Sequence, residues 1–86
     1  MPHKVEFTAS AVREFKSLER SMQRRIAVRI DLLADNPLPP DVKKLSGKPD
    51  HYRIRVGQYR VIYRIEGKRV TVVVVKIGHR RDVYRQ

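Results

Sequence analysis

The chain has 86 residues and a formal net charge of +11, from 20 Lys and Arg against 9 Asp and Glu. This length favours a single domain, residues 1–86, because two domains would leave neither with a workable core. The absence of cysteine excludes a disulfide framework, a thiolate zinc site and a cysteine nucleophile, while the excess of positive charge predicts a polyanionic partner: nucleic acid, an anionic membrane or an acidic protein.

The first third of the chain has the pattern of a strand followed by two helices. Val5 and Phe7 alternate with polar residues, as in a short strand. Apolar residues then recur at helical spacing over about 11–20 and again over 22–33, and either Thr8 or Ser10 is a suitable N-cap for the first of these helices. Because almost nothing separates the two segments, we expect an antiparallel helical hairpin.

Residues 36–50 have the composition of a loop. Three prolines end the second helix, and Lys43, Lys44 and Lys48 follow. The loop is either a plain connector or a functional basic segment, and the sequence leaves both interpretations open.

The rest of the chain predicts three strands. Residues 52–56 and 59–65 alternate apolar with basic side chains across a tight turn at Gly57-Gln58, and β-branched residues fill 70–77 as in a central strand. The predicted fold class is therefore α+β, with an N-terminal strand, a two-helix hairpin and three antiparallel strands in one sheet that carries the helices on one face.

Positive charge is concentrated in the strands and the tail. Residues 51–86 carry 10 Lys and Arg against 2 Asp and Glu, a net charge of +8. Alternation should place Arg53, Arg55, Arg60 and Arg64 together on the sheet face that the helices leave open. Like charges crowded on neighbouring strands cost stability, which favours an anion-binding face over a merely solvated one.

Two motifs resemble a known family. The segment 52–65, Tyr-Arg-Ile-Arg-Val-Gly-Gln-Tyr-Arg-Val-Ile-Tyr-Arg-Ile, precedes a valine-rich strand and then the tail 78–85, Gly-His-Arg-Arg-Asp-Val-Tyr-Arg. The Gly-x-Tyr-Arg-x-x-Tyr core and the Gly-His-Arg…Tyr tail are similar to those of the RelE/ParE toxin superfamily, and of its RelE branch in particular.

The resemblance implies a ribosome-dependent messenger-RNA endonuclease from a bacterial or archaeal toxin–antitoxin module. Such a toxin cuts the message in the ribosomal A site by attack of a ribose 2′-OH on its own 3′ phosphate, without a metal ion or another cofactor. An acidic, RelB-like antitoxin would bind and neutralise it, giving a toxin–antitoxin hetero-oligomer in the cytoplasm. No membrane partner is expected, because no apolar run approaches the roughly 18 residues of a membrane span.

The resemblance also implies roles for single residues. Arg60 corresponds to a phosphate stabiliser, Arg80 to a phosphate ligand or proton donor, and Tyr84 to a residue that stacks on a base or orients the 2′-OH. Arg53 and Arg55 stand where studied members have lysine, and an arginine cannot act as the base because it does not lose its proton. The expected RNA contacts are Arg53, Arg55, Arg64, Arg81, Lys43 and Lys44.

His79 is the candidate acid or base, because histidine ordinarily titrates near neutral pH. Its other interpretation is a strand-end histidine that is hydrogen-bonded to the backbone. Tyr52, Tyr59 and Tyr63 follow the apolar alternation and are expected to pack rather than stack on RNA, whereas for Tyr84 both interpretations stand.

Two other functions fit the same fold. One is a ParE-like toxin that inhibits DNA gyrase, and the other is an RNA-binding member of the family without catalytic activity. A metal enzyme is disfavoured, because the carboxylates are scattered and lack the spacing of metal ligands.

Overall fold

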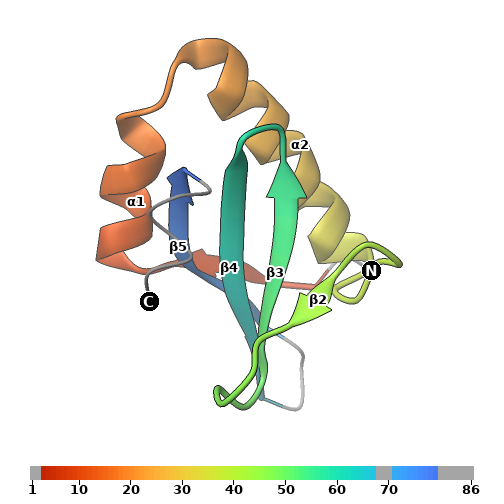
Figure 1. The fold of residues 1–86 in the computed structure, drawn as a ribbon. Coiled ribbons are helices and arrows are strands. Elements are labelled where there is room, and N and C mark those ends of the chain that lie inside the picture. The colour runs from red at the N-terminus through yellow and green to blue at the C-terminus, as the bar shows by residue number, and fades with distance from the viewer. Residues whose placement is uncertain (1–2, 68–70, 80–86) are drawn as a thin grey trace.

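The computed structural model describes residues 3–67 and 71–79, and it confirms the predicted α+β fold (Figure 1). Its elements, in chain order, are β1 (Val5–Phe7), α1 (Ala9–Lys16), α2 (Arg20–Asp35), β2 (Lys43–Lys44), β3 (His51–Val56), β4 (Tyr59–Glu66) and β5 (Thr71–His79). The short strand β2 falls within the segment 36–50 that the sequence indicated as a loop. No helix among the described residues is long and apolar enough to cross a membrane.

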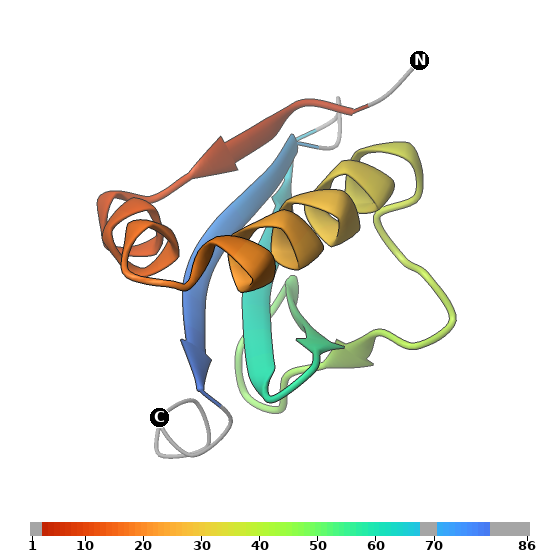
Figure 2. The ribbon, with the colours of Figure 1, turned by 90° about the horizontal axis from the view of Figure 1, so that it is seen from above.

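The strands form one twisted sheet in the order β1-β5-β4-β3-β2. Figure 2 shows β1 and β2 at its two edges. β1 pairs with β5 in parallel, and the remaining neighbours are antiparallel. The β3–β4 turn consists of Gly57 and Gln58, and Gly57 has a φ of 59°. A positive φ at this first turn position is one that glycine adopts without strain.

Side-chain hydrogen bonds define the ends of the first helix. The Thr8 hydroxyl accepts a hydrogen bond from the Ala11 amide at 3.2 Å, so that Thr8 and not Ser10 is the N-cap. At the other end, the Gln23 side-chain amide donates to the carbonyls of Phe15 and Leu18, at 3.1 Å each. Because Gln23 belongs to α2, it satisfies carbonyls at the end of α1 and in the connection, and so fixes the turn between the two helices. The chain reverses direction at this turn, and α2 crosses α1 obliquely (Figures 1 and 2).

The core lies between the helices and one face of the sheet. The helices contribute Ala11 of α1 and Ile26, Ile30 and Leu33 of α2. The strands β3, β4 and β5 contribute the residues that face the helices, which are Ile54, Val56, Val61, Tyr63, Val72, Val74 and Ile77. Tyr63 is fully buried, and its hydroxyl donates to the Pro37 carbonyl at 2.6 Å. Tyr52 and Tyr59 are partly buried against the same core, so all three tyrosines pack as the alternation predicted.

Candidate active site

The open face of the sheet carries the arginines of β3 and β4. Arg55 lies directly opposite Arg60, and Arg53 lies opposite Ile62. Ile54 and Val61, which alternate with these residues, point into the core. Arg53, Arg55 and Arg60 therefore share the face that the helices do not cover, as the alternation predicts.

These three arginines line one hollow of about 780 Å³. A volume of this order is typical of ligand pockets. The strand β2 adds Lys43, which pairs with Arg53, and the preceding loop adds Asp41. The complete lining is Asp41, Lys43, Arg53, Ile54, Arg55, Gly57, Gln58 and Arg60. With four cationic side chains and one carboxylate, the hollow is electrostatically suited to an anion.

Arg60 is the most enclosed of the four cations. It is only 5% exposed, whereas Arg55 and Lys43 are exposed. Burial restricts the rotamers of Arg60 and shields its charge from water, so a phosphate that reaches it meets a preorganised guanidinium with little solvent screening. Arg55 stands at the rim, where its Nε donates to the Gly57 carbonyl at 3.4 Å.

Two of the predicted RNA contacts lie apart from this hollow. Arg64 forms an ion pair with Glu66, with Nε and Oε2 at 2.8 Å, and does not line the hollow. Lys44 is exposed and pairs with Tyr52 across β2 and β3, also outside the lining. Arg80, Arg81 and Tyr84 lie outside the described residues.

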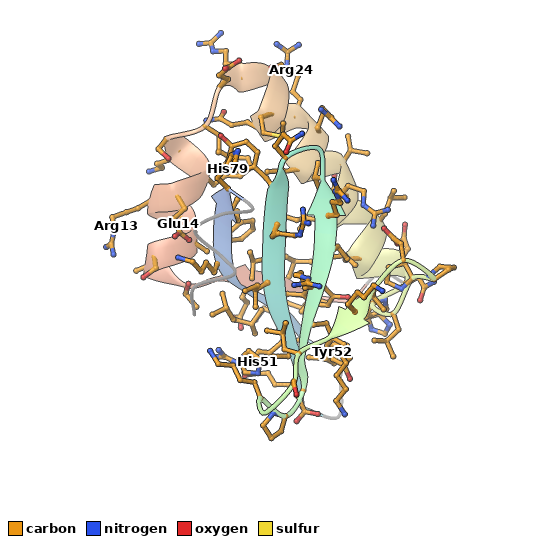
Figure 3. All side chains as sticks on the ribbon, viewed as in Figure 1. Arg13, Glu14, Arg24, His51, Tyr52 and His79 are labelled. Carbon is orange, nitrogen blue, oxygen red and sulfur yellow. The ribbon has the colours of Figure 1, made fainter. Side chains whose placement is uncertain are left out.

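His79 is on the opposite face of the sheet from Arg60. It pairs with Tyr59, whereas Arg60 pairs with Gly78, and the two rings of His79 and Tyr59 form an edge-to-face contact with centroids 5.6 Å apart. His79 lines a second hollow with Glu14 and Tyr59 at the end of β5 (Figure 3). The structure thus does not bring His79 to the arginines of the open face.

A β-bulge in β5 explains this placement. Tyr63 pairs with Val74 but Ile62 pairs with Lys76, so Val75 is an extra residue. Before the bulge the even-numbered Val72 and Val74 face the core, and after it the odd-numbered Ile77 does. One inserted residue exchanges the two faces of a strand, and His79 consequently joins the core side.

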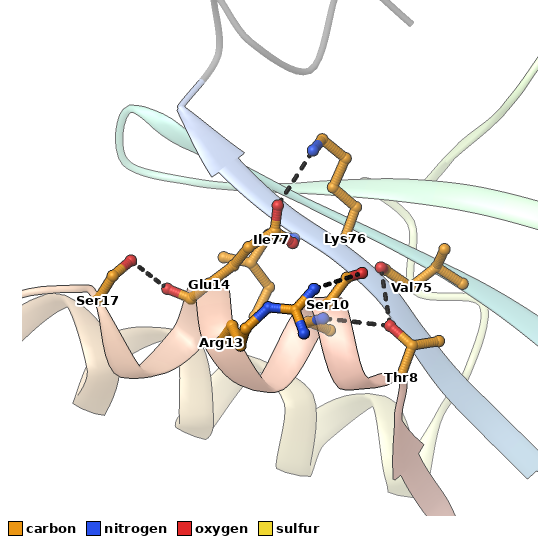
Figure 4. A network of polar contacts seen from close by, with 9 residues as sticks. Thr8, Ser10, Arg13, Glu14, Ser17, Val75, Lys76 and Ile77 are labelled. Atoms are coloured by element: carbon orange, nitrogen blue, oxygen red, sulfur yellow. Dashed lines mark hydrogen bonds and ion pairs between the residues drawn. The ribbon is translucent and has the colours of Figure 1, made fainter.

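Glu14 is a residue that the sequence did not single out. β1 covers the edge of β5 only as far as Val74, which leaves later backbone groups of that edge open. Glu14 Oε1 accepts a hydrogen bond from the Ile77 amide at 2.9 Å, and Glu14 Oε2 pairs with Lys76 Nζ at 3.1 Å (Figure 4). Glu14 thereby fixes the strand end that precedes His79 and the tail, and no local pattern in the sequence could have indicated this.

Two other titratable groups, His51 and Tyr63, fit structural roles. His51 Nδ1 lies 2.8 Å from the Pro49 carbonyl, in the turn before β3. Burial raises the pKa of the Tyr63 hydroxyl above its ordinary value. Within residues 3–67 and 71–79, no three His, Asp or Glu side chains are grouped so that they could hold a metal ion.

Comparison with known proteins identifies the family of this chain. The family model described as "ParE toxin of type II toxin-antitoxin system, parDE" matches residues 5–84. The chain belongs to this toxin family. The resemblance to the RelE/ParE superfamily that the motifs indicated is thus confirmed.

The similar proteins carry RelE names. Toxin RelG of Mycobacterium tuberculosis is 33% identical over all of both chains, and a putative RelE-like toxin protein of Escherichia coli is 32% identical over 98% of this chain and 92% of its own. A crystal structure of the archaeal RelE–RelB complex from Pyrococcus horikoshii matches with a TM-score of 0.81 and 34% identity, over 93% of this chain and 97% of that chain. The protein is therefore a RelE-like toxin of a toxin–antitoxin module.

Proposed function

We propose that this toxin is an endoribonuclease that cleaves messenger RNA in the ribosomal A site and thereby arrests translation. The observation that carries the proposal is the convergence of Arg53, Arg55 and Arg60 on one hollow of the open sheet face. The proposal is also supported by the mRNA interferase toxin RelE of Escherichia coli, which is 26% identical over 100% of this chain and 94% of its own.

The proposed reaction is an internal phosphoryl transfer. The ribose 2′-oxygen attacks the adjacent phosphorus, so that the 2′-O–P bond forms while the P–5′-O bond breaks. A base takes the 2′-OH proton and an acid gives a proton to the departing 5′-oxygen. The products are a 2′,3′-cyclic phosphate and a 5′-hydroxyl, and no metal ion or cofactor takes part.

The arginines would act on the charge that develops in the transition state. The phosphorane carries more negative charge than the substrate phosphate, and a guanidinium fork can donate two hydrogen bonds to it. Arg60 would hold this charge from its enclosed position, while Arg53 and Arg55 would orient the scissile phosphate. From the resemblance we add Arg80 as phosphate ligand or proton donor and Tyr84 as the residue that orients the ribose, with Arg81 on the RNA backbone.

The same charges favour an acidic partner. We propose that a cognate, RelB-like antitoxin binds this toxin in the cytoplasm and forms a hetero-oligomer with it, as the RelE–RelB complex of the Pyrococcus relative supports. Val28 and Leu32 lie one turn apart on α2 and are 58% and 52% exposed. Val28 lines an adjoining hollow together with Arg25, Arg29 and Arg55, so this exposed apolar pair lies next to cations and suits an acidic amphipathic segment.

Induced expression in a bacterial host tests the proposal. Primer extension on translated messages should show cuts in phase with codons, together with growth arrest. The Arg55→Ala variant should cut about a hundredfold less, because a cation that binds the transferred phosphoryl group is lost. Arg24→Ala is the matched control, since Arg24 is an exposed arginine on α2 that points away from the sheet (Figure 3).

A ParE-like activity is the second candidate, favoured by the ParE description of the matching family. Growth arrest with intact messages and trapped gyrase–DNA complexes would support it and contradict the first. If neither cuts nor trapped gyrase accompany expression, an RNA-binding protein without catalytic activity remains the better description.

A further inference from the structure

The hollow needs a proton acceptor that its arginines cannot supply. If the proposed RNA cleavage holds, a base must take the 2′-OH proton beside the phosphate bound by Arg55 and Arg60. A guanidinium does not lose its proton in a protein, and the register places His79 on the other face of the sheet. The base should therefore be sought among the other side chains that line the hollow.

Asp41 is the carboxylate that lines this hollow. It lies in the segment between α2 and β2, twelve residues after its partner Arg29. Asp41 Oδ2 accepts a hydrogen bond from Arg29 Nη2 at 2.7 Å. Among the described residues, the structure gives the second oxygen, Oδ1, no hydrogen-bond partner, so the Arg29 pair can hold the carboxylate in place and still leave one oxygen for a ligand.

A carboxylate suits the role of base better than the neighbouring lysine, because it has free lone pairs at neutral pH without help from its surroundings. The other charged residues that line the hollow or the one adjoining it are Arg25 and Arg29 on α2, Lys43 on β2, Arg53 and Arg55 on β3, and Arg60 on β4. The Tyr63 hydroxyl of β4 also interacts electrostatically with Asp41. An ordinary lysine carries its proton at neutral pH and has no lone pair to accept another, whereas a carboxylate has two acceptor oxygens.

We propose that Asp41 is the general base of this toxin, with Arg29 as its positioning residue. Asp41 Oδ1 accepts the proton of the 2′-OH as the 2′-O–P bond forms, the P–5′-O bond breaks and the departing 5′-oxygen takes a proton from the acid. The surrounding arginines hold the phosphate that receives the attack. The inference rests on the proposed endoribonuclease function. A role as base also explains why a carboxylate lies among the cations of the hollow. A site that only bound phosphate would gain nothing from a negative charge there.

Single-turnover cleavage on ribosomes programmed with a defined message tests this proposal. Asp41→Asn keeps the shape and an oxygen that Arg29 can bond, but it removes the base. We expect a fall of about a hundredfold in the cleavage rate, the lower end of what general-base catalysis contributes, with ribosome binding and thermal stability unchanged. Asp41→Glu, which keeps a carboxylate, should recover part of the rate. Asp31→Asn, an exposed aspartate of α2 outside the hollow, should behave as wild type.

A second variant separates catalysis from structure. If Asp41 only ties the loop to α2, Arg29→Gln should impair cleavage as much as Asp41→Asn does, and both should lower the melting temperature. If Asp41 is the base, Arg29→Gln keeps the carboxylate and should cost much less. Wild-type cleavage by Asp41→Asn, or equal losses in both variants, would overturn the proposal while leaving the endoribonuclease function intact. Failure of the wild-type protein to cut would instead refute the function itself.

Discussion

Loss of a single cation from the hollow should weaken the salt dependence of RNA binding by a calculable amount. Four cationic side chains line it: Lys43, Arg53, Arg55 and Arg60. Each phosphate contact on a single strand releases counterions worth about 0.7 in the slope of log affinity against log salt, so four contacts give a slope of at most about −2.8. Between 50 and 200 mM salt, the affinity should then fall by about 50-fold.

The Arg55→Gln variant is the sharpest single test, because Arg55 is exposed and its loss should leave the core unchanged. Its slope should be smaller by about 0.7, which reduces the same salt effect to about 18-fold. The assay is fluorescence anisotropy with a short single-stranded RNA that carries 2′-deoxyribose at the cleavage position, so that binding is measured without cleavage. Arg24→Gln controls for the loss of a charge elsewhere. An unchanged slope for Arg55→Gln and for each of the other three substitutions would remove this face from the RNA site.

Two further predictions follow from Tyr63 and His79. Tyr63→Phe should lower the free energy of unfolding by about 1 kcal/mol in denaturant titrations, because the hydrogen bond to the partly buried Pro37 carbonyl is lost. Burial raises the pKa of Tyr63, so this tyrosine ionises in the unfolded state at a lower pH than in the folded state. The stability of the wild-type protein relative to Tyr63→Phe should therefore fall above about pH 10, by up to about 1.4 kcal/mol per pH unit. Equal pH dependence of stability in both proteins would contradict this. His79→Gln should keep the single-turnover cleavage rate within about threefold, because its ring lies on the core face, and a loss of a hundredfold would restore His79 as the acid or base.

Much of the fold was predictable from local patterns. The alternation in 52–56 and 59–65 predicts two strands with one basic face, and β3 and β4 confirm it. Thr8 and the apolar spacing of 11–20 and 22–33 predict the helices in the same way. These features depend on neighbours only a few positions apart, which is why sequence reasoning reaches them.

The contents of the site were less accessible. The β-branched run of β5 has no alternation from which its two faces could be assigned, and the bulge at Val75 then reverses them, so the side of His79 could not be foreseen. Asp41 reaches the hollow through its pairing with Arg29 on another element, and Glu14 reaches Ile77 across 63 positions of sequence. Contacts of this kind are set by tertiary packing and leave no periodic signal in the chain.

The chemistry of the cut ends tests the central claim most directly. Purified toxin should be mixed with ribosomes programmed with a defined message, and the fragments analysed for their termini. The account predicts one cut within the A-site codon, with a 2′,3′-cyclic phosphate on the upstream fragment and a 5′-hydroxyl on the downstream one. An intact message, or a 5′-phosphate on the downstream fragment, would contradict the assignment of this arginine-lined hollow as a metal-independent ribonuclease site.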